Sequence, residues 1–465
     1  MNQTIQPMIQ PIKSGRLESL DVFRGLTIAA MLLVNNAGDW SRIWGPLGHA
    51  EWNGCTSTDL IFPFFLFIMG VAMQFSFAGR LTKEGGKKAL IGQVIRRTLL
   101  LTLLNTILAI FIWKSYLGHY RFYGVLQRIA LCYFFASFIM LYFGIRGQIM
   151  FFFMLMAVYY IIIKFISAPG EIAGSIERFK SILDYVDTKL FGGFNYQLEE
   201  KLIDGKKVLL GHDPEGLIST LTAISTTLAG AICGYWLRLK DKTNFEKVAG
   251  MSVIGMLIVI VAKLMKHDIP FNKNLWTPSY VLYTAGAALL CLSVCYWLID
   301  IKGYKKWSKP FLYYGTNAIT AYFGASMMAL VVVTMRWKVD SANTFFELFY
   351  YTFYPAILAL MCAVACYFLL TIKESWSESQ KYLIYGITLI VIALCLVLMV
   401  RWNIDVDPQI KFIRLKTYIY SNYYKSWIPG IFGDYACSAA FGSSYVILWC
   451  FLMWLLHRRK IFIKI

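Results

Sequence analysis

Residues 58–79 read TDLIFPFFLFIMGVAMQFSFAG, a nearly unbroken apolar run with Asp59 at its start. A helical run of about 20 apolar residues is long enough to cross the hydrocarbon core of a bilayer. Similar runs recur along almost the whole chain, whose 465 residues are 58% hydrophobic and 15% charged. Because a backbone in lipid must satisfy its own hydrogen bonds, such runs form helices. The sequence therefore predicts an all-α fold, a polytopic transmembrane helix bundle.

The predicted bundle has about twelve spans, with ten as the lower bound, and both termini are expected in the cytoplasm. The first twenty residues are polar and lack the apolar core and cleavage site of a secretory signal. Connections on one side of the bundle, among them RLKDKTNFEK and IKGYKKWSK, are rich in Lys and Arg, which marks that side as cytoplasmic. The predicted spans cover residues 20–38, 58–79, 98–114, 121–143, 147–167, 217–237, 248–265, 276–299, 310–335, 350–371, 382–400 and 440–457.

The whole chain, residues 1–465, is predicted to form a single transmembrane domain. Two long connections, 168–216 and 401–439, are expected on the exterior side, where each is long enough to cover a membrane-embedded site. No internal repeat is apparent, which disfavours the inverted-repeat architectures of many transporters.

Charge and cysteine content narrow the classes of function. The formal net charge of +19 reflects the positive-inside bias of a polytopic protein, so nucleic acid is not an expected partner. The ten cysteines are scattered, mostly within apolar runs, and form no CxxC pair. They are interpreted as packing residues, and no metal site is predicted.

A polar stretch, GHAEWNGCTST, lies directly before the second predicted span. It contains His49, whose imidazole is a group that transfers protons in catalysis, and Asp59 is available to orient the ring. Asn35 and Asn36 lie near the end of the first span, level with this loop, and can serve as hydrogen-bond donors. Helix capping by Thr58, with Asp59 in the first turn, explains part of the same pattern without any catalytic function.

Other polar residues within or beside the spans are candidate site residues, because charges in the bilayer are costly. Asp21 and Arg24 are three residues apart and form either an ion pair or part of a site. Arg128, which follows Gln127 in the fourth span, needs an anionic partner, either a carboxylate of the protein or a phosphate.

Three further groups lie at the predicted span ends. Asp213 and Glu215 lie at the exterior mouth of the sixth span, where they serve either structural capping or substrate recognition. Lys273 and Asn274 precede the eighth span, and Asn317 lies within the ninth. Single polar residues of this kind more often hydrogen-bond neighbouring helices than bind ligands.

Seven stretches in this order resemble the lysosomal heparan-alpha-glucosaminide N-acetyltransferase family and its bacterial relatives. They are SLDVFRG, HAEWNGCTSTDLIFPFFLFIMG, GVLQRIA, DPEGLISTL, NKNLWTPSYV, GTNAITAY and the terminal RRKIFIKI. The resemblance implies a transmembrane acetyltransferase that carries an acetyl group from cytoplasmic acetyl-CoA, its co-substrate, to the amine of a glucosamine-type sugar or glycan outside. It implies His49 as the active-site histidine, with Asn35 beside it and Asp59 supporting it.

The remaining expectations concern binding, assembly and location. We expect a protein of the bacterial inner membrane, in contact with the lipid bilayer, with His49 toward the periplasmic side; the resemblance suggests a homodimer. The residues expected to bind acetyl-CoA are Arg24, Gln127, Arg128, Lys460 and Lys464. The residues expected to bind the acceptor are Trp52, Asn53, Asp213, Glu215, Asn274 and Asn317.

Two departures from the family pattern are apparent. Residues 340–435 look like an inserted helical hairpin followed by an exterior loop, and the lumenal domain and first span of the lysosomal members have no counterpart. His49 acts either as a nucleophile that carries the acetyl group or as a general base in direct transfer, the mechanism we favour. The alternative functions are transport of amino sugars or oligosaccharides and acyl transfer to another cell-envelope glycan.

Overall fold

The structure of the protein is a computed structural model that describes residues 17–81, 86–112, 119–203, 206–338, 349–370, 377–405 and 412–463. Its longer helices are α1 (Glu18–Asn35), α2 (Ile61–Leu81), α3 (Gly86–Ile112), α4 (Val125–Tyr142), α5 (Ile145–Phe165), α7 (Ser219–Arg238), α8 (Asn244–Met265), α9 (Pro278–Cys295), α11 (Ala318–Thr334), α13 (Tyr354–Leu370), α14 (Glu378–Asp405) and α16 (Ile428–Arg458). The shorter elements are η1 (Gly45–Leu47), η2 (Thr58–Leu60), α6 (Ile182–Phe191), η4 (Gly192–Phe194), η5 (Tyr296–Ile301), α10 (Lys309–Thr316), η6 (Phe349–Phe353), α15 (Leu415–Ile419) and η7 (Tyr420–Tyr424). The strands are β1 (Gln197–Ile203), β2 (Lys206–His212), β3 (Arg336–Lys338) and β4 (Phe412–Arg414).

The predicted all-α helix bundle is confirmed, but the count of twelve spans is not. Among the described residues, nine helices are long and apolar enough to cross a membrane, or ten if α10 and α11 together form one bent span. Helix α1 falls short because Glu18, Asp21 and Arg24 lie in its 18 residues. Helix α13 falls short because its apolar part, Tyr354–Leu369, is shorter than an ordinary span.

The ninth predicted span, 310–335, is not one continuous helix. Helices α10 and α11 meet at an angle of 85°. The bend falls at Asn317, which ends α10 and precedes α11. The hydrophobic run was correctly recognised, whereas its change of direction was not, because hydropathy carries no information about helix direction.

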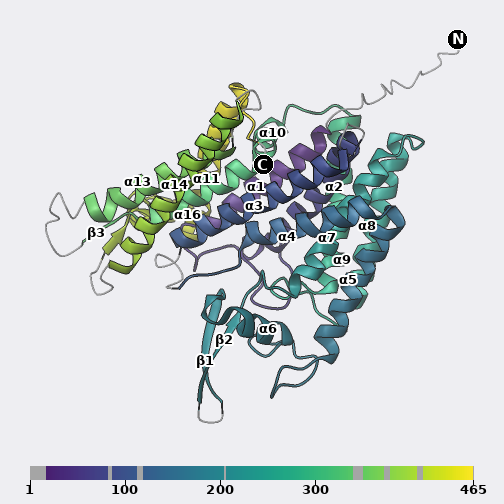
Figure 1. Cartoon of the computed structure of the whole chain (residues 1–465), viewed down its shortest axis with the longest axis horizontal. Coiled ribbons are helices and arrows are strands. Elements are labelled where there is room, and N and C mark those ends of the chain that lie inside the picture. Colours follow the sequence, from purple (N-terminus) through teal and green to yellow (C-terminus); the bar gives the residue numbers. More distant parts are fainter. Residues whose placement is uncertain are drawn as a thin grey trace.

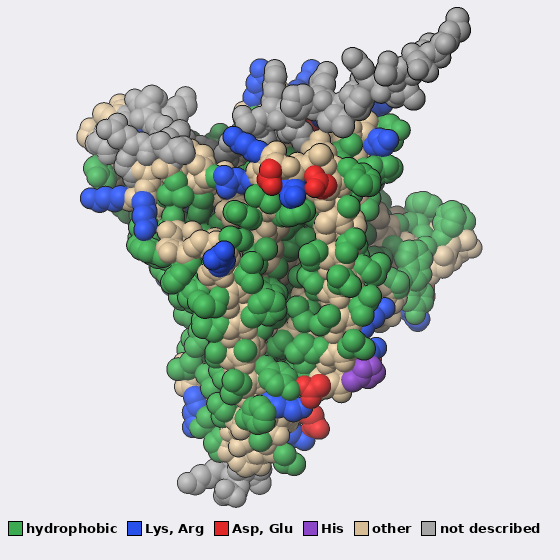
Figure 2. All heavy atoms as spheres, turned by 90° about the vertical axis from the view of Figure 1, so that its right-hand side faces the viewer, with side chains coloured by type: hydrophobic (Ala, Val, Ile, Leu, Met, Phe, Trp, Pro, Cys, Tyr) green, Lys and Arg blue, Asp and Glu red, His purple; other side chains and the backbone are tan. Residues whose placement is uncertain are grey.

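The outer surface fits a lipid environment. Helix α8 exposes several large apolar side chains, including Val253, Leu257, Val261 and Leu264. Figure 2 shows one face of the molecule, on which hydrophobic side chains cover the middle while charged side chains gather mainly toward the two ends. A belt of exposed apolar side chains between two charged ends is what a bilayer requires. The protein is therefore an integral membrane protein.

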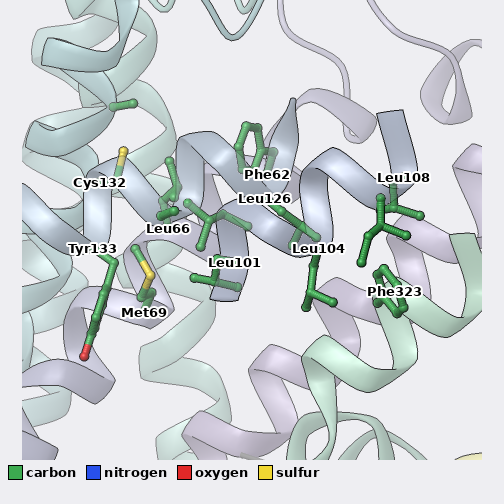
Figure 3. Close-up of a cluster of buried hydrophobic side chains, with 14 of the residues drawn as sticks. Phe62, Leu66, Met69, Leu101, Leu104, Leu108, Leu126, Cys132, Tyr133 and Phe323 are labelled. Carbon is green, nitrogen blue, oxygen red and sulfur yellow. The ribbon is translucent and has the colours of Figure 1, made fainter. Parts of the chain in front are cut away.

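The core of the bundle is built largely from α2, α3, α4 and α7. Figure 3 shows side chains of one buried cluster, among them Leu66, Leu101 and Cys132, all fully buried. Helices α2 and α7 approach closely at glycines. A Cβ atom on Gly70 would lie 1.9 Å from the carbonyl oxygen of Thr227, so only glycine fits there.

Helix α9 and η5 connect the two ends of the bundle. The Tyr280 hydroxyl, near the start of α9, donates a hydrogen bond to the Asp59 carbonyl at 2.5 Å. Asp300, in η5, accepts one from the Ser19 amide of α1 at 3.2 Å. Tyr280 and Asp300 are separated by roughly 30 Å along the helix. We call the end that holds Asp59 and the starts of α2, α4, α7 and α9 the His49 end, and the opposite one the Arg24 end.

The connection 168–216 is not the plain loop that was expected. It contains α6 and an antiparallel hairpin, in which Gln197 pairs with His212 and Ile203 with Lys206. Figure 1 shows this unit projecting from one end of the bundle. Because α5 precedes it and α7 follows it, the unit lies over the His49 end.

Region 340–435 contains α13 and α14, which pack against each other. Strand β3 lies just before this region and pairs with β4 inside it, where Arg336 is opposite Arg414 in the register. Farther on, the Ser438 carbonyl accepts a hydrogen bond from the Gly38 amide at 3.3 Å. The segment that follows the two helices therefore contacts the loop between α1 and α2, which also holds His49.

Candidate active site

The loop before α2 is folded around the carboxylate of Asp59. Oδ2 of Asp59 lies 3.1 Å from the Ala50 amide nitrogen and 3.0 Å from both the amide nitrogen and the hydroxyl of Thr56. The Thr58 hydroxyl donates to the Pro46 carbonyl at 3.1 Å and does not cap a helix, contrary to the capping interpretation. Asp59 is therefore an acceptor buried inside the loop, with 1% of its side chain exposed.

The other carboxylate oxygen of Asp59 binds His49. Nδ1 of His49 lies 2.7 Å from Oδ1 of Asp59. A carboxylate in this position holds the proton on Nδ1, which leaves the lone pair of Nε2 free. The His49 side chain is 48% exposed. The pair thus presents a proton-accepting nitrogen at the surface while its carboxylate is buried.

Lys273, from the connection between α8 and α9, completes this group. Its Nζ lies 3.1 Å from Nδ1 and 3.3 Å from Nε2 of His49, and 3.7 Å from Oδ1 of Asp59. Burial lowers the pKa of Lys273, although Asp59 opposes the shift. Lys273 was named beside Asn274 before the eighth predicted span, but no role in the site was assigned to it. Its position within NKNLWTPSYV was the available signal.

Cys55 is the nearest thiol in the same loop. Burial, reinforced by the charge of Asp59, raises its pKa to about 12. A thiol with so high a pKa is hardly ionised at neutral pH and is a poor nucleophile. Of these two side chains, His49 is therefore the better candidate for a catalytic group.

Trp52 anchors the His49 loop to the unit formed by 168–216. Its indole N–H donates to the Ile176 carbonyl at 2.9 Å. The guanidinium of Arg178 lies 4.7 Å from the centre of the Trp52 ring, and the His212 ring meets it edge-on at 5.1 Å. Its ring therefore holds the two segments together, in addition to the acceptor binding expected of it.

A second anchor joins the loop to the connection between α8 and α9. The Asn53 side chain accepts a hydrogen bond from the side-chain amide of Asn272 at 3.1 Å. The backbone amide of Gly54 donates to the Phe271 carbonyl at 2.7 Å. Asn274 lies in the same turn as Lys273. The structure thus brings Trp52, Asn53 and Asn274 close to His49.

Asn35 ends α1 and has an exposed side chain. Within the described part of the chain, no hydrogen bond joins Asn35 to His49. Its neighbour Asn36 donates to the Leu32 carbonyl of its own helix at 2.8 Å. Helix α1 does pack against η2, which contains Asp59, so Asn35 lies at the His49 end.

Asp213 and Glu215 both bind Arg121. Nε of Arg121 donates to Asp213 at 2.9 Å, and its Nη2 contacts both carboxylates. The two carboxylates raise the pKa of Arg121 further, against the effect of burial. This geometry matches the structural alternative for Asp213 and Glu215 and leaves neither carboxylate without a protein partner.

Arg128 also lies at the His49 end, in the first turn of α4. It is fully buried, and its Nη2 donates to the Gly216 carbonyl at 3.0 Å and contacts the Ser219 hydroxyl. Nε and Nη1 have no hydrogen-bond partner among the described residues. Gln127 faces away from this group and accepts a hydrogen bond from Asn105 of α3 at 3.3 Å.

The remaining predicted site residues lie at the Arg24 end. Arg24 binds Asp21 and the Gly315 carbonyl, both at 3.2 Å. Asn317 donates to the Ile461 carbonyl at 3.1 Å and accepts from the Ile463 amide at 2.9 Å, so it holds the chain segment beside Lys460. Lys464 lies outside the described residues. The structure thus separates Arg24, Asn317 and Lys460 from His49.

Comparison with known proteins shows similarity to heparan-alpha-glucosaminide N-acetyltransferases. Residues 16–187, which include His49 and Arg128, match the family described as heparan-alpha-glucosaminide N-acetyltransferase, catalytic. The heparan-alpha-glucosaminide N-acetyltransferase of Mus musculus is 27% identical over 370 residues, which cover 70% of this chain and 55% of the relative. The Homo sapiens protein of the same name is 29% identical over 357 residues, 66% and 52% of the two chains.

The chain spans about half the length of these curated relatives. The matched family region nevertheless contains the whole loop that Asp59 organises, from Gly48 to Asp59. The resemblance predicted from the sequence motifs is thereby confirmed: the chain is similar to the heparan-alpha-glucosaminide N-acetyltransferases over about two thirds of its length.

Proposed function

We propose that the protein is a transmembrane acetyltransferase that moves an acetyl group from cytoplasmic acetyl-CoA to the amine of a glucosamine-type sugar or glycan on the exterior side. The observation that carries the proposal is the His49–Asp59 pair at 2.7 Å, in a region that matches an N-acetyltransferase family. The names of the two relatives support the same reaction and the same class of acceptor.

In the proposed reaction His49 is the general base. An acceptor that arrives as an ammonium first loses one proton to solvent. Nε2 of His49 then takes a proton from the amine nitrogen as that nitrogen bonds to the acetyl carbon. The carbon–sulfur bond breaks, and the thiolate of CoA takes up the proton, so His49 is restored. General base catalysis of this kind supplies about 10² to 10⁴ in rate. Direct transfer fits one site that holds both substrates, because proximity already lowers the entropic barrier.

The two ends of the bundle suit the two substrates. Arg24 and Lys460 lie at the Arg24 end and are proposed to bind the CoA phosphates, together with Lys464. Arg128 lies at the His49 end and is better placed to contact acetyl-CoA near its acetyl group. We propose that the pantetheine arm of CoA crosses the bundle between the two ends, where the structure holds a small apolar cavity lined by Ile28, Phe62, Val125, Ile129 and Tyr322 among others.

The acceptor is proposed to bind at the His49 end. Asn35, Asn53, Asn274 and Trp52 present polar or aromatic groups around His49 there. The bacterial inner membrane as the location, the exterior orientation of His49 and the homodimer remain predictions from the resemblance.

The test uses purified protein in detergent with radiolabelled acetyl-CoA and glucosamine. We expect labelled N-acetylglucosamine from the wild type and none above background from His49→Ala. His267→Ala, at an exposed histidine of the α8–α9 connection, is the matched control and should keep full activity. Full activity in His49→Ala would refute the assignment, and mass spectrometry of the product would reveal another acyl acceptor. Sugar uptake into proteoliposomes without acetyl-CoA would instead support a transporter.

A further inference from the structure

The ammonium group of Lys273 occupies a defined position beside the His49 ring. Nζ is 3.1 Å from Nδ1 and 3.3 Å from Nε2, almost equally far from both nitrogens. An atom in the plane of the ring at these distances would collide with Cε1, the carbon between the two nitrogens. Nζ therefore lies over the face of the imidazole.

This position leaves the in-plane direction of Nε2 free. Ring nitrogens accept protons in the plane of the ring, and Lys273 is out of that plane. Nδ1 is directed at Asp59, 2.7 Å away. A substrate nitrogen can therefore approach Nε2 while the ammonium of Lys273 faces the same space from one side.

The turn that carries Lys273 is held firmly. The Trp276 amide donates to the Lys273 carbonyl at 3.2 Å. Asn272, which is fully buried, accepts a hydrogen bond from the Leu275 amide at 2.9 Å, and its own amide donates to the Thr277 hydroxyl at 3.1 Å. The Lys273 side chain is 22% exposed and lies 3.7 Å from Asp59. A cation held this way needs little reorganisation before the reaction.

We propose that Lys273 is a third catalytic residue, whose ammonium donates a hydrogen bond to the acetyl oxygen as that oxygen becomes negatively charged. The role rests on the proposed function. The amine nitrogen bonds to the acetyl carbon, and the electron pair of the carbonyl double bond moves to the oxygen. Lys273 stabilises this oxyanion and keeps its own proton. When the carbon–sulfur bond breaks, the pair returns and the carbonyl is restored, so the overall balance of the acetyl transfer is unchanged.

The ammonium group of Lys273 also affects the protonation state in which the acceptor amine binds. An ammonium acceptor would meet a like charge at Lys273, whereas the neutral amine, which is the nucleophile, would not. A protonated His49 would also face a cation 3.1 Å from Nδ1. Lys273 therefore favours the protonation states that the reaction needs at both the base and the nucleophile.

The experiment compares Lys273→Met, Lys273→Arg and wild type in the labelled acetyl-CoA assay, with kcat and KM measured for both substrates. Lys266→Met, at an exposed lysine of the same connection, is the matched control and should behave like the wild type. Loss of one oxyanion donor lowers kcat by about 10² to 10³ in well-measured enzymes, so we expect a fall of this size in Lys273→Met. KM for acetyl-CoA should change little, and the acid limb of the pH–rate profile should move to higher pH.

A Lys273→Met protein that folds and keeps kcat within about threefold of the wild type, well below the loss expected of an oxyanion donor, would overturn the role. A change in KM alone would do the same. If Lys273→Met does not elute as the wild-type peak in gel filtration, Lys273→Arg decides. The guanidinium introduced in Lys273→Arg keeps the positive charge but cannot place it where Nζ lies over the His49 ring, so kcat should fall by about tenfold. An unchanged kcat would refute the role. Absence of acetyl transfer by the wild type would instead refute the proposed function.

Discussion

Replacing Asp59 by asparagine separates its two functions, organising the loop and orienting His49. Oδ2 of Asp59 faces three donors, the amides of Ala50 and Thr56 and the Thr56 hydroxyl. In Asp59→Asn the amide oxygen must take this place, because an NH₂ group cannot accept hydrogen bonds. The NH₂ group then faces Nδ1 of His49, which must become the acceptor, so the proton moves to Nε2.

The expected losses follow from this geometry. A histidine with its proton on Nε2 can act there neither as a base nor as a nucleophile. The equivalent change in the best-measured His–Asp pair lowers kcat by about 10⁴, and we expect a loss of about 10² to 10⁴. Asp59→Ala instead leaves three donors without their acceptor, at a cost of about 1 to 3 kcal/mol for each one that water does not reach. Its unfolding free energy should fall by about 3 kcal/mol or more.

The assay measures kcat with labelled acetyl-CoA and thermal unfolding in detergent on the same preparations. Asp59→Asn should unfold close to the wild-type temperature and be nearly inactive, whereas Asp59→Ala should be both unstable and inactive. Asp241→Asn, at an exposed carboxylate far from the loop, controls for the loss of charge. Activity of Asp59→Asn within about tenfold of the wild type would refute the reasoning, since neither mechanism operates with the wrong tautomer.

Three further outcomes follow from individual contacts. Burial raises the pKa of Asp187 from 3.8 to about 7, so its ionisation costs stability as pH rises from about 4 to about 7. Asp187→Asn should therefore melt at a higher temperature than the wild type above pH 7 and at a similar one near pH 4; equal melting at both would contradict this. Gly70→Ala should destabilise by about 1 to 3 kcal/mol or more in denaturant titrations, whereas Gly92→Ala, where a Cβ meets open space, should not. Trp52→Ala should lower kcat and increase proteolysis of the His49 loop. Trp52→Phe, which keeps an aromatic ring, should have smaller effects. Unchanged proteolysis in Trp52→Ala would show that the Trp52 side chain does not anchor the loop.

Hydropathy located the helices because the bilayer imposes one length and one composition on all of them. The run 58–79, for example, corresponds to α2 at Ile61–Leu81. Hydropathy could not reveal the bend at Asn317, since it carries no information about the direction of a helix. The hairpin of β1 and β2 was not predicted because its strands are short and partly charged, although DG at 204–205 is a hairpin signal.

The candidate site was predictable only in its local part. His49 and Asp59 are ten residues apart, so a single loop can bring them together, and the structure places them in contact. Lys273 comes from more than two hundred positions later, and only the packing of α9 against α2 brings it there. Asn317, which was expected to bind the acceptor, instead lies at the Arg24 end, where it hydrogen-bonds Ile461 and Ile463.

The His49 loop is positioned by contacts that converge from three directions. Tyr280 of α9 holds the Asp59 backbone, Asn272 holds Asn53, and the unit 168–216 holds Trp52. A base on a loop is effective only if its geometry is fixed before the substrate arrives, because reorganisation during the reaction raises the barrier. The three anchors supply that fixation at a half-exposed histidine. Through its contact with Trp52, the unit 168–216 therefore helps to fix the loop that carries the proposed base.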